Sequence, residues 1–223
     1  MMTVTLIAIV ALMATFLTWI VRQTINVQPW EATSTPDDGR GRLPSFLTTP
    51  RVGLIVVMAA ITSLFALIIS AYNGRMMIGS DWVSVDIPAI LWGNTLVLVL
   101  SSMFLHLAWR ASADGDRGAA RVRLLLGGAS ALLFIAGQAV AWMQLRRSGL
   151  PLAVNPASAF FVLVTALHVL HLLGGLVAWV RAYARLEGAS EPRRAEAGIG
   201  LCTIYWHFLL GIWLILFGLL LIT

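Results

Sequence analysis

The chain has 223 residues, of which 59% are hydrophobic and 11% are charged, and its mean hydropathy is +0.88. This composition is typical of a polytopic membrane protein and excludes an ordinary soluble domain. The net charge of +5 comes from arginines scattered over the chain, so anchoring at a membrane surface explains it better than nucleic-acid binding. The single cysteine, Cys202, excludes an internal disulfide and any multi-cysteine metal or iron–sulfur site.

The apolar runs predict an all-α fold, a polytopic membrane helical bundle with six transmembrane helices. Each run extends over about 20 residues, the length that a helix needs to cross a bilayer, and helix is the state that satisfies the backbone in lipid. The predicted helices span residues 3–21, 52–72, 87–109, 122–145, 156–180 and 200–222.

The first predicted helix is set apart from the others by a segment rich in proline and short polar residues. No basic residue precedes its apolar run and no clear cleavage site follows, so we interpret it as a true helix rather than a signal peptide. The predicted domains are therefore an N-terminal transmembrane helix at 1–22, a cytoplasmic linker at 23–50, and a five-helix core at 51–223.

The distribution of arginines predicts the orientation. Twelve arginines lie in the segments on one side of the predicted helices, and the other side holds only Arg75, Arg146 and Arg147. Because arginine is enriched in cytoplasmic loops, this bias predicts that both termini face outward. Six tryptophans near predicted helix ends favour interface anchoring: Trp19, Trp82, Trp109, Trp142, Trp179 and Trp206.

Two stripes of small and polar residues predict the faces that pack inside the bundle. One runs along the fifth predicted helix through Val164, His168, His171, Gly175 and Ala178. The other runs along the sixth through His207, Gly211, Leu214 and Gly218. Small residues beside polar ones favour close helix contact in lipid, so we expect both stripes in the bundle interior.

The histidines raise the question of a haem or metal site. His168 and His171 are three residues apart on one helix and so do not form opposite axial ligands, which leaves His106 with His207 as the plausible pair. A zinc or copper site needs three or four convergent ligands, and no aspartate or glutamate lies in any predicted span to complete one. We therefore expect no cofactor in this chain. The missing carboxylates also argue against an autonomous proton-coupled transporter.

Five motifs occur in a fixed order along residues 45–223. They are Gly53–Tyr72, with Leu-Phe-Ala and a final Ala-Tyr; Pro88 followed by Leu91–Ser102; Phe134-x-x-x-Gln138-x-x-x-Trp142; FFVLVTALHVLHLLGG at 160–175; and YWHFLLGIWLILF at Tyr205–Phe217. In this order they resemble subunit III of the haem–copper oxidases, a family best known from cytochrome c oxidase.

The resemblance implies a non-catalytic subunit of a respiratory terminal oxidase in a bacterial plasma (inner) membrane. Subunit III of that family carries no haem or copper, packs on catalytic subunit I, binds phospholipid, and supports oxygen access, proton uptake and stability. Haem and copper are expected in the partner subunits. The expected partners are subunit I, subunit II, membrane lipid and, as an open question, further subunits of a respiratory complex.

The resemblance also implies the residues that meet neighbours. Those expected in helix packing, or in contact with a partner or lipid, are Asn94, Gln138, Trp142, His168, His171, Gly175, Trp206, His207 and Trp213. Those expected at lipid headgroups on the inner side are Arg42, Arg51, Arg121 and Arg185.

The chain departs from the family at three positions inside the predicted helices. Ile61, Ala141 and Leu210 stand where the family commonly has carboxylates, so a role of those carboxylates in proton handling does not carry over. The long form of the family also has two helices before the core, where this chain has one. Two alternatives stay open: an accessory subunit of a nitric oxide reductase, and a stand-alone membrane transporter or assembly factor.

Overall fold

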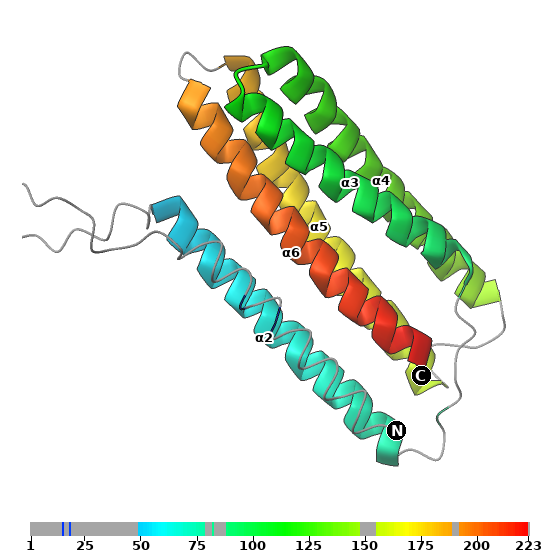
Figure 1. Cartoon of the computed structure of the whole chain (residues 1–223). Coiled ribbons are helices and arrows are strands. Elements are labelled where there is room, and N and C mark those ends of the chain that lie inside the picture. The colour runs from blue at the N-terminus through cyan, green and yellow to red at the C-terminus, as the bar shows by residue number, and fades with distance from the viewer. Residues whose placement is uncertain are drawn as a thin grey trace, which may run out of the picture. The chain divides into compact units, whose positions relative to one another are not determined.

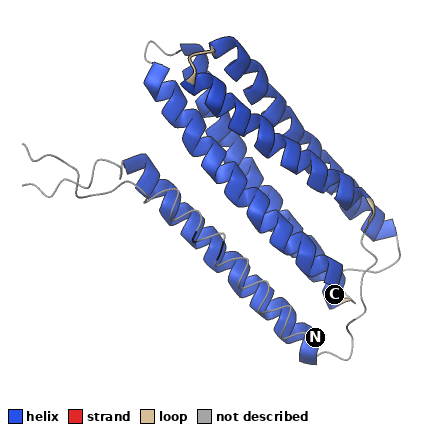
Figure 2. Cartoon of the chain, in the orientation of Figure 1, coloured by secondary structure: helices blue, strands red, loops and turns tan. Residues whose placement is uncertain are grey.

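The computed structural model of the chain describes residues 49–78, 88–147, 155–188 and 192–222, together with Thr15, Thr18 and Trp82. The regular structure of these residues is entirely helical (Figure 2). The helices are α2 (Thr49–Ile78), α3 (Ile90–Ala113), α4 (Arg117–Arg147), α5 (Pro156–Gly188) and α6 (Pro192–Ile222). All five are long and apolar enough to cross a membrane.

The chain divides into two units, residues 1–57 and 58–223, and the boundary falls within α2. The predicted helix at 3–21 lies outside the described residues, apart from the helical Thr15 and Thr18. The predicted linker at 23–50 is likewise undescribed up to residue 48, and Arg42 with it, whereas Thr49 and Pro50 begin α2. The remainder of the description concerns the second unit.

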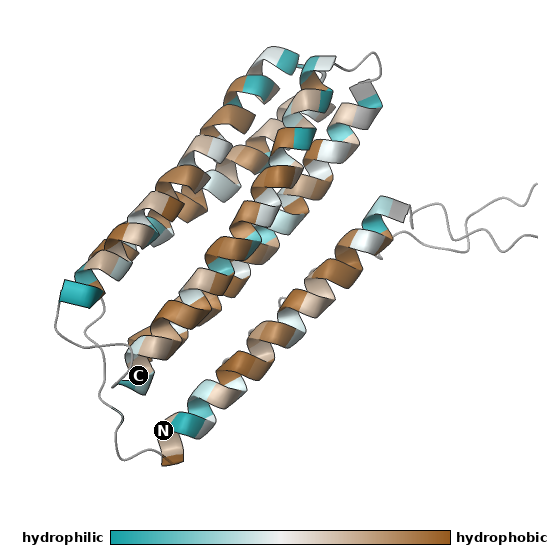
Figure 3. Ribbon diagram, turned by 180° about the vertical axis from the view of Figure 1, so that it is seen from behind, coloured by the Kyte–Doolittle hydropathy of each residue, from teal (hydrophilic) through white to brown (hydrophobic). Residues whose placement is uncertain are grey.

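The helices are longer than their apolar runs predict. The predicted loop at 181–199 is largely wrong, because α5 continues to Gly188 and α6 begins at Pro192. At 1.5 Å per residue, the 33 residues of α5 extend about 50 Å, well beyond a hydrocarbon core of about 30 Å. Figure 3 shows the physical reason: the middles of the helices are mainly hydrophobic, and the polar residues gather toward their ends. An apolar run therefore marks only the part of a helix inside the hydrocarbon.

Short polar caps begin α4 and α5. The turn from α3 to α4 contains Gly115, whose φ of 81° lies in the left-handed region that glycine adopts without strain. The Asp116 carboxylate then accepts a hydrogen bond from the Ala119 N–H at 2.9 Å. Asn155 caps α5 similarly, accepting from the Ala157 N–H at 3.1 Å. Such caps satisfy backbone donors that the first helical turn leaves unpaired.

Helices α3 to α6 form a ring of antiparallel neighbours (Figure 1). Each packs on the next along the chain, and α6 closes the ring on α3. This up-down-up-down arrangement is that of a four-helix bundle with short connections. The contact between α3 and α4 is the most extensive. Buried side chains from all four helices fill the centre of this ring, among them Asn94, Phe134, His168 and Trp213.

The second-unit part of α2 contacts α5 through one stripe. Its buried residues recur every three or four positions, as an amphipathic contact requires: Met58, Ile61, Phe65, Ile69 and Tyr72. The Phe65 ring lies 5.5 Å from the His171 ring, and Tyr72 meets Phe160 edge-on at 5.4 Å, both distances being between ring centroids. These contacts place α2 antiparallel to α5, since residue numbers rise along one helix as they fall along the other.

The stripe predicted for the interior of α6 is wrong at Leu214 and Gly218, whereas His207 does contact α3. Leu214 is 47% exposed, and a Cβ added at Gly218 would meet no atom within 4 Å. The most deeply buried side chains of α6 are bulky instead, among them Trp206, Trp213 and Phe208. On α5 the prediction is largely confirmed, because Val164, His168 and Gly175 are buried.

Replacing Gly175 tests the close contact of α5 with α6. A Cβ at Gly175 would lie 2.9 Å from Cζ3 of Trp206 and 3.0 Å from Cε1 of Tyr205, whereas a Cβ at its neighbour Gly174 would meet no atom within 4 Å. Gly175→Ala should therefore be less stable than Gly174→Ala by about 1–3 kcal/mol, the usual effect of overpacking. Thermal unfolding of both variants in detergent micelles measures the difference. Equal melting temperatures would contradict the contact.

Candidate functional site: the polar interior of the bundle

Indole N–H groups bridge the helices of the ring. The Trp206 indole on α6 donates to the Ser101 hydroxyl on α3 at 2.9 Å, and Ser101 donates in turn to the Gly127 carbonyl on α4 at 2.7 Å. One buried side chain therefore connects three helices. Gly127 permits this approach, because a Cβ there would lie 3.0 Å from Cγ of Leu105.

Two further tryptophans donate to threonine hydroxyls on a neighbouring helix. The Trp213 indole on α6 donates to Thr95 on α3 at 2.9 Å. The Trp142 indole on α4 donates to Thr165 on α5, also at 2.9 Å. Both threonines donate back to their own helix, Thr95 to the Leu91 carbonyl and Thr165 to the Phe161 carbonyl. Each hydroxyl thus has both a donor and an acceptor as partners.

A fourth tryptophan pairs with a backbone carbonyl. The Trp179 indole on α5 donates to the Leu124 carbonyl on α4 at 2.8 Å. The ring lies against Gly128, where a Cβ would approach it to 2.5 Å. We predicted that the membrane interface anchors Trp142, Trp179 and Trp206. That prediction is wrong for their N–H groups, which donate to acceptors inside the bundle. Trp109, which is 37% exposed, fits the prediction better.

A hydrogen-bonded row of side chains joins α3 to α6. The Ser102 hydroxyl and His207 Nδ1 lie 2.5 Å apart, and His207 Nε2 lies 3.4 Å from His106 Nδ1. One turn away, the Thr203 hydroxyl donates to the Leu105 carbonyl at 3.1 Å. His106 and His207, considered from the sequence as a haem pair, thus contact each other directly, with ring centroids 5.5 Å apart.

His171 and Gly175 lie at the contact of α5 with α6. The Nδ1–H of His171 donates to the Leu167 carbonyl of its own helix at 2.7 Å. The Tyr205 hydroxyl on α6 donates to the His171 carbonyl at 3.2 Å. Gly175 is buried beneath Trp206 and Tyr205. Both residues therefore lie at the contact between α5 and α6.

Asn94, Gln138 and His168 occupy the centre of the bundle and are buried. The Asn94 amide donates to the Phe134 carbonyl at 3.4 Å and lies against Gly137, which has no room for a Cβ. His168 is surrounded by rings from three helices, with centroid distances of 6.5 Å to Phe65, 5.9 Å to Phe134 and 5.2 Å to Trp213. The side-chain nitrogen and oxygen atoms of Gln138 and His168 have no hydrogen-bond partner.

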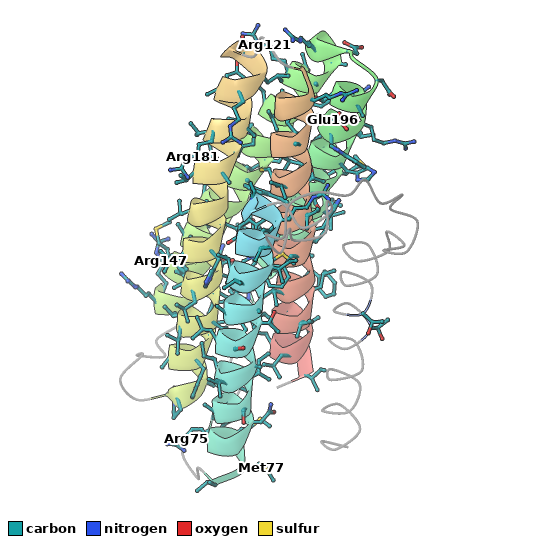
Figure 4. All side chains as sticks on the ribbon, turned by 90° about the vertical axis from the view of Figure 1, so that its left-hand side faces the viewer. Arg75, Met77, Arg121, Arg147, Arg181 and Glu196 are labelled. Atoms are coloured by element: carbon teal, nitrogen blue, oxygen red, sulfur yellow. The ribbon has the colours of Figure 1, made fainter. Side chains whose placement is uncertain are left out.

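The predicted headgroup arginines differ in their surroundings. Arg121 on α4 pairs through Nε with Glu187 on α5 at 2.9 Å, and the two side chains are 55% and 41% exposed. The Arg185 side chain lies over α6, since a Cβ at Gly198 would be 3.4 Å from its Nη1. Arg51 is exposed on α2. Figure 4 shows Arg121 and Glu196 at one end of the second unit and Arg75 at the other.

Several of these contacts lie outside the residues that sequence reasoning singled out. Thr203 and Glu187 gave no signal, because a threonine or a loop glutamate looks the same in sequence whether or not a partner faces it, and Thr95 was part of a motif but was not singled out as a packing residue. Within the described ranges, no three residues among histidine, cysteine, aspartate and glutamate converge as metal ligands do. The five long apolar helices define a multi-pass membrane protein. The polar groups of its interior mostly join one helix to another.

Comparisons with known proteins agree with the sequence motifs. The family model for cytochrome c oxidase subunit III matches residues 1–222. The chain belongs to the cytochrome c oxidase subunit III family. It is 30% identical over 172 residues to the "Probable cytochrome c oxidase subunit 3" of Mycobacterium tuberculosis, and this match covers 74% of the present chain and 84% of the relative. It is 29% identical over 177 residues to the "Cytochrome c oxidase subunit 3" of Thermostichus vulcanus, covering 76% and 85%.

Ser101→Ala tests the bridge at the centre of the ring. The substitution removes the acceptor of the Trp206 N–H and leaves that donor buried without a partner, which should destabilise the chain by about 1–3 kcal/mol. Ser130→Ala is the matched control, because Ser130 donates only to the Leu126 carbonyl of its own helix. Thermal unfolding in micelles measures both, and tryptophan fluorescence reports the environment of the indole. A Ser101 variant as stable as the control would rule out the bridge.

Proposed function

We propose that this chain is the non-catalytic subunit III of a respiratory terminal oxidase of the cytochrome c oxidase type. The observation that carries the proposal is the family match over residues 1–222. In this function it packs on catalytic subunit I, alongside subunit II, and the haem and copper that reduce oxygen belong to those partners. The relatives found are named as cytochrome c oxidase subunits, which disfavours the nitric oxide reductase and transporter alternatives.

The outer faces of the helices support a role in a larger membrane assembly. Large apolar side chains are exposed along α4, among them Leu132 and Leu133, and along α5, among them Leu170 and Val177. In a bilayer such faces meet either lipid tails or another apolar protein surface. We assign one of them to subunit I and the rest to lipid.

The interior supports an indirect part in proton uptake and oxygen access. Ile61 and Ala141 stand where relatives commonly have carboxylates, and both are buried apolar groups. Leu210, the third such position, is partly buried. The chain therefore contributes to proton uptake by supporting the structure of subunit I, and not through carboxylates at these three positions.

The charged ends of the helices support an orientation and a lipid site. We propose that the end holding Arg121 faces the cytoplasm of a bacterial cell, with both termini on the outer side of the plasma membrane. Arg121 and Arg185 would then lie at the level of inner-leaflet phosphates. Because Glu187 already shares the charge of Arg121, Arg185 is the stronger phosphate ligand of the two. Arg42 and Arg51 remain proposed contacts of the same kind.

Co-purification tests the proposed function. An affinity tag on this chain should retain subunits I and II from the membrane in mild detergent, and the reduced-minus-oxidised spectrum of the preparation should show haem. His171→Leu and His168→Leu should weaken retention of this subunit and leave the haem content per subunit I unchanged. Mass spectrometry and visible spectroscopy provide the readouts. A haem band in the chain purified alone would refute the proposal, as would isolation without any oxidase subunit.

Replacing Arg185 tests the lipid site. Arg185→Gln should reduce the number of phospholipids that remain bound to the complex in native mass spectrometry, because a phosphate loses its charged partner. Arg147→Gln is the control, since Arg147 ends α4 at the opposite end from Arg121. Equal lipid counts in the two variants would remove Arg185 from the lipid site. Retention of subunit I, measured in the same samples, shows whether assembly was affected.

A further inference from the structure

Two polar side chains at the centre of the bundle stand out because they are fully enclosed and unpaired. Gln138 on α4 and His168 on α5 are both 0% exposed. Among the described residues, the amide nitrogen and oxygen of Gln138 and the two ring nitrogens of His168 have no hydrogen-bond partner. A buried polar group that lacks a hydrogen-bond partner destabilises the fold. Four such atoms in one place therefore call for a ligand.

The helix contacts on either side place Gln138 opposite His168. The Trp142 indole bonds to Thr165 on one side, and the Phe134 ring meets the His168 ring on the other. Gln138 lies one helical turn from both Phe134 and Trp142, on the same face of α4. Thr165 and His168 are likewise three residues apart on one face of α5. Gln138 thus faces the stretch of α5 that runs from Thr165 to His168.

The groups around this pair offer it no partner of their own. The Thr165 hydroxyl accepts from Trp142 and donates its one proton to the Phe161 carbonyl, so it has no donor left for Gln138 or His168. The Trp213 indole beside His168 donates to Thr95. Phe65 and Phe134 present only apolar rings. At this depth neither the bilayer nor these neighbours supply the missing hydrogen bonds.

The chemistry of the four atoms identifies the ligand. A carboxamide presents two donors and an acceptor oxygen, and a neutral imidazole presents one donor and one acceptor. A ligand that satisfies both must donate and accept at once, which water does and an apolar molecule does not. An ion would be bound without a counter-charge, since no three metal-ligating residues converge in the described part of the chain. We propose that Gln138 and His168 hold an ordered water that bridges α4 and α5 at the centre of the bundle.

This bridge would join α4 and α5 at a level where no direct side-chain bond does so. Buried waters typically make about three hydrogen bonds to groups that would otherwise be unsatisfied. Such a water differs from the lipid proposed at the helix ends, because it is enclosed by four helices and independent of the partner subunits. The inference therefore holds or fails separately from the proposed function.

A density map of the full-length chain, in the purified complex or in a lipid nanodisc, tests the bridge directly. At a resolution that shows ordered solvent, the map should contain a peak within hydrogen-bond distance of both the Gln138 carboxamide and a ring nitrogen of His168. A direct bond between the two side chains would overturn the proposal. So would a continuous density of lipid shape, or an absence of any peak in a map that shows solvent elsewhere at this depth.

A double-mutant cycle tests the energetic coupling. Gln138→Met and His168→Phe each remove one side of the bridge while keeping volume, and each should raise the equilibrium constant for unfolding in micelles several-fold. Their combination should raise it by clearly less than the product of the two effects, because the second substitution finds the bridge already lost. Gln138→Met combined with Ser130→Ala, on the same helix, is the control and should be multiplicative. A multiplicative effect for Gln138 with His168 would refute the bridge.

If the phenylalanine variant fails to accumulate, His168→Asn keeps the cycle measurable. Asparagine retains one donor and one acceptor, and so should preserve part of the coupling to Gln138. Coupling equal to zero in that cycle would again refute the bridge. The density map of the unmodified chain does not depend on any of these variants.

Discussion

A buried N–H inside a bilayer is costly unless it finds an acceptor, and in this chain four indole N–H groups find theirs on a neighbouring helix. Trp206 and Trp213 on α6 bond to Ser101 and Thr95 on α3. The two tryptophans are seven residues apart and their acceptors six, so both bonds form only in one antiparallel register. Trp142 and Trp179 fix α4 against α5 in the same manner. The alignment of all four helices in the ring follows from these bonds.

The same bonds explain where glycine is needed. Two of these indole rings lie so close to the backbone of a neighbouring helix that a side chain there would clash with the ring. Gly128 lies beneath Trp179 and Gly175 beneath Trp206. Gly218, by contrast, has open space where a side chain would be and meets no such ring. Glycine in these helices is thus structurally required where a neighbouring helix approaches closely, as also at Gly137 beside Asn94, and its recurrence along one face does not by itself identify an interior.

Apolar runs predict where helices lie but do not reveal how they pair. The five helices of the described residues were predictable because about 20 apolar residues have few other states in a membrane. The lengths of α5 and α6 were not predictable, because charged residues at the end of a helix resemble those of a loop. Sequence also misled on Trp206, whose position near an expected helix end is typical of interface anchoring. Whether its N–H meets a headgroup or Ser101 depends on α3, which lies about a hundred residues earlier in the chain.

The contrast between Trp206 and Gln138 shows what kind of site residue sequence identifies. Both belong to recurring motifs, so both were singled out, but a motif carries no statement of partners. Trp206 has its partner in the fold, whereas Gln138 and His168 do not. Glu187 shows the opposite case, a residue without a motif that proves to neutralise Arg121. The sequence shows which polar residues are present, but only the assembled helices show whether each one has a hydrogen-bond partner.

The chemical character of the interior limits what this chain does by itself. Its described central polar side chains are amides, hydroxyls, indoles and imidazoles, and the nearby positions Ile61 and Ala141 are apolar. Apart from Gln138 and His168, these groups mostly bond to a neighbouring helix, without the large penalty of burying a carboxylate in lipid. They hold a bundle in a single register and present an outer surface of fixed shape. A fixed apolar surface in a membrane suits docking by another protein, in keeping with membership of a family of oxidase subunits.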